Sequence, residues 1–251
     1  MLRRLLLACA FVIGCQRAST DDPVTPAPVD VPVTDRADAT PPVSPPATED
    51  RPGFYLGREL APTMTFHGAD WLTRDERDDE ENTTLMHARL GLSPGDVACD
   101  IGAGNGYHAL KMARAVAPTG KVLAVDIQPQ MLDLLDARAR EAGITNVQRV
   151  LSTQTDPKLA DGACDLILLV DVYHELEDPA AMLGHLRRAL SPKGRIALLE
   201  FRAEDPDVPI KALHKMSKAQ ILREYEANGL QLAGAFDGLP WQHLMFFTAA
   251  P

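Results

Sequence analysis

A glycine-rich turn beside a carboxylate is the first candidate for chemistry in this sequence. An apolar run at 97–101 contains Asp100, and glycine occupies positions 102, 104 and 106 directly after it. Glycine lets a backbone approach a ligand closely, and the amphipathic segment after the turn would offer the free N–H groups of a helix N-terminus. Strand, glycine turn and helix in this order predict a pocket for a nucleotide-like ligand.

The spacing of these glycines narrows the choice of ligand. The dinucleotide-binding fingerprint is G-x-G-x-x-G, and Tyr107 stands where its third glycine would be. Asp100 would repel a diphosphate but would suit a ligand with an ammonium group. A second apolar run, 121–125, ends in Asp126, which lies 20 residues after Gly106. A carboxylate at this distance can accept hydrogen bonds from both hydroxyls of a ribose.

Further apolar runs alternate with amphipathic segments along the rest of the chain. Asp178 and Ser217 are predicted to cap the helices that follow them. The alternation predicts an α/β fold whose parallel strands are joined by right-handed crossovers, with a final apolar hairpin. The strands expected after the glycine turn are 121–125, 147–151, 165–170, 195–200, 231–236 and 243–248.

Four of these segments resemble the motifs of class I S-adenosylmethionine-dependent methyltransferases, in the family's order and spacing. They are 97–106, 122–128, 164–174 and 190–200, and the resemblance covers roughly residues 85 to 249. It implies a Rossmann-like fold with a seven-stranded, mostly parallel sheet, an antiparallel last strand and helices on both faces. It implies S-adenosylmethionine as the cofactor and leaves the methyl acceptor unidentified.

The resemblance also assigns residues to the cofactor, which is expected across the carboxyl ends of the strands. Asp100 would face the methionine ammonium, Asp126 would hold the ribose, and residues 127–128 would flank the adenine. Ser152 and Thr153 stand where family members often carry a Gly-Asp pair. The predicted cofactor-binding residues are Asp100, Gly102, Ala103, Gly104, Asn105, Gly106, Asp126, Ile127, Gln128, Thr153, Gln154 and Asp171.

The methyl acceptor is expected above residues 171–175. An oxygen or nitrogen acceptor must lose a proton, and His174 has a suitable unperturbed pKa for a base, which would contribute roughly 10²–10⁴ in rate. Tyr173 is the second predicted catalytic residue. The alternative is that His174 only caps its loop or contacts the next helix. Other polar side chains expected near this rim are those of Glu200, Arg202 and His214. The sequence has no zinc-type cluster of ligands, so we predict no metal site.

The beginning of the chain resembles a bacterial lipoprotein signal. Two arginines precede a nine-residue apolar stretch, 5–13, which is too short to span a bilayer. Residues 12–15 resemble a lipobox, which implies cleavage before Cys15 and a lipid on its thiol, and Gln16 would permit outer-membrane sorting. The alternative, a buried N-terminal helix, is disfavoured by the polar, proline-rich sequence after Cys15.

Four segments are therefore expected. Residues 1–14 form the signal peptide, and residues 15–50, with eight prolines, form a disordered tether. Residues 51–92 form a helical arm that covers the pocket, and residues 93–251 form the methyltransferase core. Within the arm, Thr73 and Glu76 predict a capping box that starts one long helix. His67 and Trp71 are the pair expected on the acceptor side.

Charge and cysteine content limit the partners. The formal net charge is −10 and no run of Lys or Arg occurs after residue 50, so we expect no nucleic acid partner. Cys99 falls late in its strand and Cys164 at the start of its own, so two buried free thiols are expected far apart. The predicted partners are a small-molecule methyl acceptor and, through the lipid on Cys15, a membrane. The sequence predicts no oligomeric state.

The predicted location and the predicted cofactor conflict with each other. S-adenosylmethionine is made in the cytosol, whereas the signal predicts a lipid-anchored protein on the periplasmic side of the cell envelope. Three interpretations follow. The chain is an active membrane-tethered methyltransferase with a small or apolar acceptor, or a catalytically silent lipoprotein that binds a nucleoside-like molecule with the same fold. The third, a nicotinamide-dependent oxidoreductase, is disfavoured by the glycine spacing.

Overall fold

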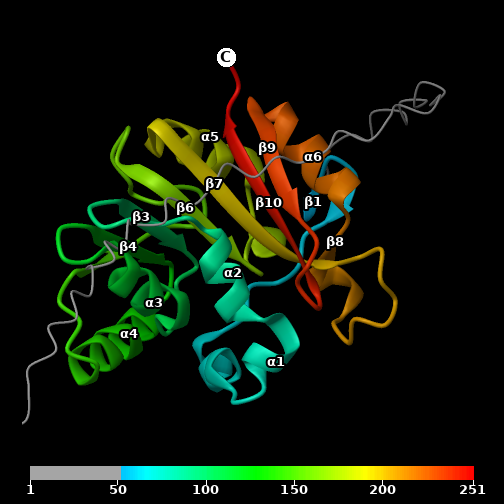
Figure 1. The fold of residues 1–251 in the computed structure, drawn as a ribbon. Coiled ribbons are helices and arrows are strands. Elements are labelled where there is room, and N and C mark those ends of the chain that lie inside the picture. The colour runs from blue at the N-terminus through cyan, green and yellow to red at the C-terminus, as the bar shows by residue number, and fades with distance from the viewer. Residues whose placement is uncertain (1–51) are drawn as a thin grey trace, which may run out of the picture. The chain divides into compact units, whose positions relative to one another are not determined.

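The computed structural model describes residues 52–251 (Figure 1). The predicted signal peptide, lipidation site and tether at 1–50 lie outside these residues. The predicted arm and core lie within them, apart from Arg51. None of the helices in the described part has the length and hydropathy that crossing a bilayer requires.

One sheet forms the centre of the described chain. Its main path has seven strands in the order β5-β4-β3-β6-β7-β10-β9, and the two-residue β8 (Lys215–Met216) adds to β7. β10 is antiparallel to both of its neighbours, and the other pairs are parallel. This order confirms the predicted mostly parallel sheet with an antiparallel last strand. The strands are β3 (Val97–Ile101), β4 (Lys121–Asp126), β5 (Val147–Leu151), β6 (Cys164–Val170), β7 (Leu190–Arg202), β9 (Leu230–Phe236) and β10 (Gln242–Ala249).

Helices cover both faces of this sheet because its central strands are apolar on both sides. In β4, Val122 and Ala124 belong to one buried cluster and Leu123 and Val125 to the other. The first cluster includes α3 side chains and the second includes α5 and α6 side chains. Asp178 and Ser217 cap α5 and α6 as predicted, each accepting a hydrogen bond from the backbone N–H three residues on. The helices are α3 (Tyr107–Val116), α4 (Pro129–Glu141), α5 (Pro179–Ala189) and α6 (Lys218–Ala227).

The arm is more broken than predicted. It contains β1 (Phe54–Tyr55), β2 (Arg58–Glu59), the 3₁₀ helix η1 (Phe66–Thr73), α1 (Arg77–Glu81) and α2 (Thr83–Arg89). The predicted capping box is wrong, because Thr73 ends η1 and Glu76 makes no side-chain cap. Asn82 separates α1 from α2 with a left-handed φ of 50°, and its side chain accepts a hydrogen bond from Leu85 N. Asparagine tolerates this conformation and supplies the cap, so two short helices replace the one expected.

The expectation of two free thiols is also wrong. Cys99 and Cys164 form a disulfide with 6.0 Å between their Cα atoms, and both residues are fully buried. β3 and β6 are hydrogen-bonded neighbours, and the β6 ladder with β7 shifts register between Cys164 and Leu166. Counting residues along two regular strands therefore misplaced Cys164.

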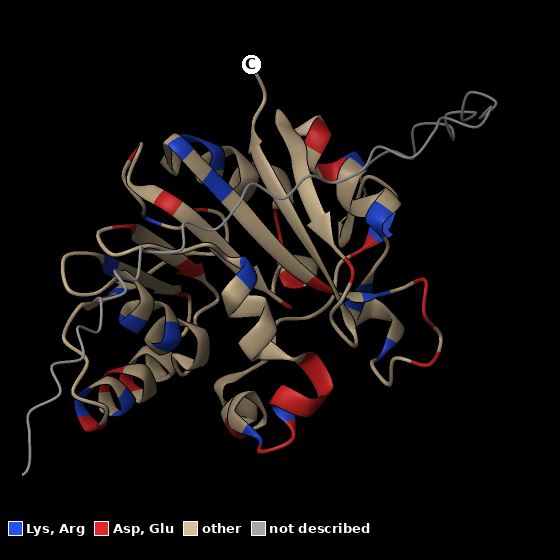
Figure 2. Cartoon of the chain, viewed as in Figure 1, with Lys and Arg blue, Asp and Glu red and all other residues tan. Residues whose placement is uncertain are grey.

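Charged residues are distributed unevenly over the elements. Figure 2 shows acidic residues gathered on α1, whereas the Lys and Arg residues are spread over several elements of the described chain. The absence of a nucleic acid partner stays a prediction.

Candidate functional site

A cavity of about 580 Å³ lies at the carboxyl ends of β3, β4, β6 and β7. Ile101, Asp126, Val170 and Phe201, from the ends of those four strands, line it. The arm contributes residues between Thr63 and Glu81, and the loop before α6 contributes residues between 209 and 214. The volume is in the usual range for small-molecule sites, and the position is where parallel α/β sheets bind ligands.

Most of the residues predicted to bind the cofactor line this cavity. These are Gly102, Gly104, Asp126, Ile127, Gln128, Thr153, Gln154 and Asp171. Those predicted as cofactor contacts that do not line it are Asp100, Ala103, Asn105 and Gly106.

Asp126 is fixed by the backbone of the glycine turn. Its Oδ2 accepts a hydrogen bond from Gly104 N and its Oδ1 accepts one from Gln128 N, both at 2.8 Å. Burial raises the pKa of this carboxyl even though the backbone donors favour its charged form. The backbone of Ile127 is a third donor to this carboxylate. A carboxylate accepts about four hydrogen bonds, so Asp126 keeps capacity for a further donor.

Asp100 lies behind the turn instead of facing the cavity. It is 2% exposed, and its Oδ2 has no hydrogen-bond partner among the described residues. Burial, and then the charge of Asp126, raise the pKa of Asp100 to about 7, while a hydrogen bond from the backbone of Ala109 in α3 opposes the shift. This position argues against the predicted role of Asp100 in facing the ammonium group and assigns Asp100 to holding the turn.

The other residues of the turn that do not line the cavity serve packing. Asn105 donates to Ala69 O and accepts from Arg138 Nη1, which links the turn to the arm and to α4. A Cβ at Gly106 would lie 2.8 Å from Leu135 Cγ, so only glycine lets α4 pack this closely. Their contribution to a ligand is therefore indirect.

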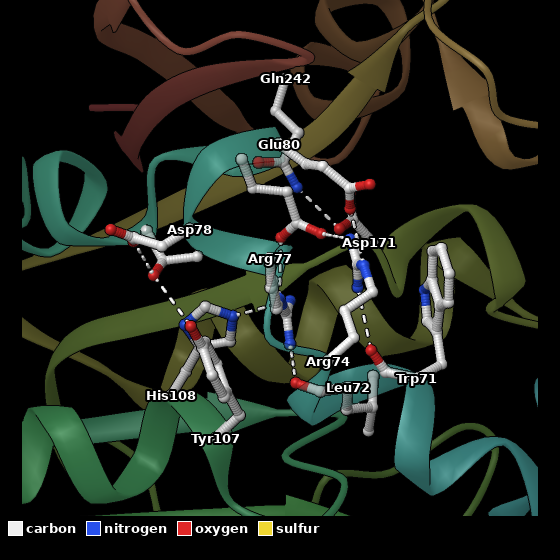
Figure 3. A network of polar contacts seen from close by, with 12 residues as sticks. Trp71, Leu72, Arg74, Arg77, Asp78, Glu80, Tyr107, His108, Asp171 and Gln242 are labelled. Atoms are coloured by element: carbon white, nitrogen blue, oxygen red, sulfur yellow. Dashed lines mark hydrogen bonds and ion pairs between the residues drawn. The ribbon is translucent and has the colours of Figure 1, made fainter.

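Asp171, an acid in the cavity wall, has both an unusual backbone conformation and a buried oxygen without a partner in the described part of the chain. It follows β6 with a φ of 51°, which is unusual for a residue other than glycine. Its Oδ2 accepts from Gln242 Nε2 at 2.7 Å (Figure 3), but its Oδ1 is buried without a hydrogen-bond partner among the described residues. Burial first, and then the charges of Glu81 and Glu200, raise the pKa of Asp171 well above its usual value. An unpartnered carboxyl oxygen in a cavity wall fits a ligand that brings a positive charge.

A network around Arg77 holds the arm against this end of the cavity (Figure 3). Arg77 donates to Glu81 Oε2 at 2.9 Å and to Leu72 O at 2.8 Å, and its Nη2 lies 3.0 Å from His108 Nε2. Its guanidinium also lies over the Tyr107 ring, 4.3 Å from the centroid. Sequence reasoning missed Arg77, because no motif surrounds it and its partners His108 and Tyr107 lie about 30 residues away in the chain.

Gln128 attaches the arm from the other side. Its Oε1 accepts from Phe66 N at 2.7 Å and its Nε2 donates to Met64 O at 2.9 Å. The side chain predicted to flank an adenine is thus occupied by the arm. Of the expected acceptor-side pair, Trp71 lines the cavity and is 50% exposed, whereas His67 does not line it.

Two imidazoles and two carboxylates form a further polar cluster of the site, which we call the His174 cluster (His174, Glu175, Glu200 and His214). The 3₁₀ helices η2 (Tyr173–Glu175) and η3 (Ala212–His214) bring them together above β7. His174 Nδ1 lies 2.6 Å from Glu200 Oε2, and His174 Nε2 lies 3.0 Å from His214 Nδ1. Glu175 Oε1 is 3.9 Å from each of these last two nitrogens.

The electrostatics of the cluster follow from its burial. Burial alone would lower the pKa of His174, but Glu200 and then Glu175 outweigh it and raise the pKa. Burial and the nearby His174 lower the pKa of His214. Glu200, expected at the rim, is instead fully buried next to His174, while Arg202 donates to Pro240 O and does not line the cavity.

Tyr173, the second predicted catalytic residue, points into the core. It is fully buried, its hydroxyl donates to Glu224 Oε2 at 2.7 Å, and it does not line the cavity. Glu224 also accepts two hydrogen bonds from Arg58, at 2.7 and 2.9 Å. The position argues against a catalytic role and assigns Tyr173 to a buried polar network that joins the arm to α6.

Comparison with known proteins gives consistent results. The family model described as "Methyltransferase domain" matches residues 92–243. The ubiquinone/menaquinone biosynthesis C-methyltransferase UbiE of Psychromonas ingrahamii is 31% identical over 112 residues, 44% of this chain and 45% of that protein. An uncharacterized 37.1 kDa protein in a Streptomyces fradiae transposon is 32% identical over 117 residues, 47% of this chain and 33% of that protein. The chain thus spans half or less of the length of these curated relatives.

Solved structures share the fold. A SAM-dependent methyltransferase from Aquifex aeolicus superimposes with a TM-score of 0.69 at 21% identity, covering 74% of this chain and 98% of that one. The complex between the Haloferax volcanii Trm112 methyltransferase activator and a putative methyltransferase gives a TM-score of 0.56 at 16% identity, covering 75% of this chain and 100% of that one.

Proposed function

Because the chain belongs to the methyltransferase domain family, we propose that it is an S-adenosylmethionine-dependent enzyme that methylates a small or apolar acceptor. S-adenosylmethionine is the cofactor that this family membership implies, and it supplies a methyl group on a positively charged sulfur. The observation that carries the proposal is the cavity at the strand carboxyl ends, in which Asp126 and Asp171 lie on the wall.

The residues of the cavity fit the charges and donors of this cofactor. Asp126, held by backbone N–H groups, would accept a ribose hydroxyl through its remaining capacity. The unpartnered Oδ1 of Asp171 would accept the methionine ammonium. Gly102 and Gly104 line the cavity between these acids, so the backbone itself can contact the ligand.

The acceptor is placed beside the His174 cluster. Met64, Trp71, Phe201 and Ile210 line the cavity along with His174, so an apolar or aromatic acceptor would bury its surface there. The UbiE relatives are named for ubiquinone and menaquinone biosynthesis, which supports a quinone-like acceptor. His174, oriented by Glu200, is the predicted catalytic residue that lines this part of the cavity.

We extend the proposal to the location of the enzyme. A lipid on Cys15 would anchor it to a membrane of the bacterial envelope, and residues 16–50 would tether the catalytic domain on the periplasmic side. The buried disulfide between Cys99 and Cys164 supports export, because such bonds form and persist in oxidising compartments. An apolar acceptor dissolved in a membrane would be within reach of a tethered enzyme.

The test is calorimetric titration of the full chain with S-adenosylmethionine, S-adenosylhomocysteine and adenosine, followed by transfer of labelled methyl groups to a reduced quinone. Asp126→Ala should abolish binding of the first two ligands. Asp133→Ala is the matched control, because Asp133 is an exposed acid on α4 that pairs with Arg149. Equal affinity for S-adenosylmethionine and adenosine, without methyl transfer, would favour the silent nucleoside-binding lipoprotein. No binding of either would overturn the assignment.

A further inference from the structure

The His174 cluster has the composition of a metal site. We propose that His174 Nε2, His214 Nδ1 and a carboxylate oxygen of Glu175 bind a divalent first-row transition-metal ion in the cavity wall. The ligand atoms all lie within 4.8 Å of one another, and all three residues line the cavity.

The distances fit a single ion. Two imidazole nitrogens bound at about 2.1 Å and at right angles to each other lie about 3.0 Å apart. His174 Nε2 and His214 Nδ1 are 3.0 Å apart. Glu175 Oε1, at 3.9 Å from each nitrogen, must move by roughly 1 Å to complete the set, which a side-chain rotation supplies. Two nitrogens and one carboxylate oxygen on one side of an ion leave its remaining positions open toward the cavity.

The surroundings of His174 prepare it as a ligand. Glu200 is fully buried; its Oε2 lies 2.6 Å from His174 Nδ1, and its Oε1 accepts from the backbone N of His174 at 3.2 Å. A proton on Nδ1, shared with a carboxylate, fixes the tautomer whose Nε2 lone pair is free for a metal. This carboxylate–histidine arrangement is a frequent outer shell of metal sites, and here it also fixes the ring orientation.

The donor types favour the same conclusion. Two imidazoles and one carboxylate with open positions are the donor set of catalytic zinc and non-haem iron(II) sites. The sequence could not show this set, because His214 lies 40 residues after His174 in a separate loop.

The metal site has a consequence for the acceptor that rests on the proposed function. The open positions face the part of the cavity assigned to the acceptor, so a hydroxylated aromatic compound could bind there through its oxygen. A bound cation lowers the pKa of such a hydroxyl, and its proton would pass to water. His174 would then act by holding the ion, and the acceptor class would be one with an ionisable hydroxyl group.

The test uses the full chain, stripped with a chelator and titrated with Zn²⁺ by calorimetry and with Co²⁺ by visible absorption. We expect one ion per chain. Glu200→Gln should weaken binding by about 10- to 100-fold, the usual effect of losing an outer-shell partner, and His214→Ala should weaken it more. Glu175→Gln, which keeps the size of the side chain, tests the third ligand if His214→Ala does not fold.

His185→Ala is the matched control for metal binding by histidines outside the proposed site. His185 lies on α5 and is hydrogen-bonded to Arg188, and it does not line the cavity. Its variant should bind the ion like the unmodified chain. S-adenosylhomocysteine binding, measured on every variant, reports that the pocket is intact. The metal site would be refuted if the unmodified chain did not bind a stoichiometric metal ion. It would also be refuted if the His214→Ala and Glu175→Gln variants bound the ion as tightly as the unmodified chain. Failure of the unmodified chain to bind S-adenosylhomocysteine would instead refute the proposed function, whatever the metal result.

Discussion

Replacement of Asp171 by asparagine tests directly whether this residue binds the ammonium group of the cofactor. The substitution keeps the shape of the side chain and an oxygen that can accept from Gln242, but it removes the negative charge. The Oδ1 of Asp171 has no partner among the described residues, so the unliganded protein loses no hydrogen bond there. The change should therefore act on ligand binding more than on folding.

The size of the effect follows from the contact that is lost. A hydrogen bond that involves a charged group contributes about 1.5–3 kcal/mol, so the affinity for S-adenosylhomocysteine should fall by about 10- to 150-fold. Burial, with the charges of Glu81 and Glu200, keeps the pKa of Asp171 well above its usual value, and Arg77 opposes this shift only in part. A raised pKa favours the protonated form of Asp171 in the free protein, whereas a bound ammonium favours its charged form, so binding should be accompanied by release of a proton.

This release gives the prediction a pH dependence with a definite sign. Affinity of the unmodified protein should increase as pH rises toward the raised pKa of Asp171, by at most tenfold per unit. Calorimetry in two buffers of different ionisation enthalpy should detect net proton release on binding. In the Asp171→Asn variant the proton release and the slope should both disappear.

The control is Asp161→Asn, an exposed acid in a loop before β6 whose nearest charged partner is Arg188 at 3.8 Å. It should bind S-adenosylhomocysteine with unchanged affinity and slope. If the Asp171→Asn variant bound as tightly as the unmodified protein, with the same slope, the assignment of Asp171 to the ammonium would be refuted.

Three further predictions concern stability. Replacing Cys99 and Cys164 by alanine should lower the free energy of unfolding by about 4 kcal/mol, because the bond closes a loop of 65 residues; an unchanged urea midpoint would contradict the disulfide. Burial, then Lys111 and Arg77, lower the pKa of His87 to about 4, so this group should withdraw roughly 3 kcal/mol of stability as pH falls from about 6.5 to about 4. Asp100, with a pKa raised to about 7, acts in the opposite direction, so urea denaturation of the unmodified protein and of His87→Gln at several pH values checks the difference between their slopes. Tyr173→Phe should lower the free energy of unfolding by about 1.5–3 kcal/mol through the lost hydrogen bond to Glu224, while kcat stays unchanged; a large fall in kcat would restore Tyr173 as a catalytic candidate.

The sheet and the glycine turn could be predicted because their signals are local. Apolar runs of strand length, glycines at fixed spacing and acidic residues at strand ends are all visible within a few residues. Asp178 and Ser217 were recognised as caps for the same reason, since a cap and its partner are three residues apart. Asp126 was assigned from a spacing that the parallel βαβ unit imposes.

The remaining features depend on which elements meet in space. His214 reaches His174 from a loop 40 residues away, and Arg77 reaches His108 from 31 residues away. The sequence does not encode these separations as a pattern. Tyr173 is expected at the site from its place beside His174, but its side chain points to the opposite side of the backbone, into the core.

The distribution of charge explains how one cavity can have two chemical functions. Asp126 and Asp171 lie in the cavity wall, and burial raises the pKa of both carboxyls above the usual value. A positively charged ligand stabilises the charged forms of these two acids, so the cavity should bind a positively charged nucleoside more tightly than adenosine. Glu200 holds His174 with its Nε2 lone pair available to a metal ion or a proton. The apolar residues that line the cavity with His174 are left for the acceptor.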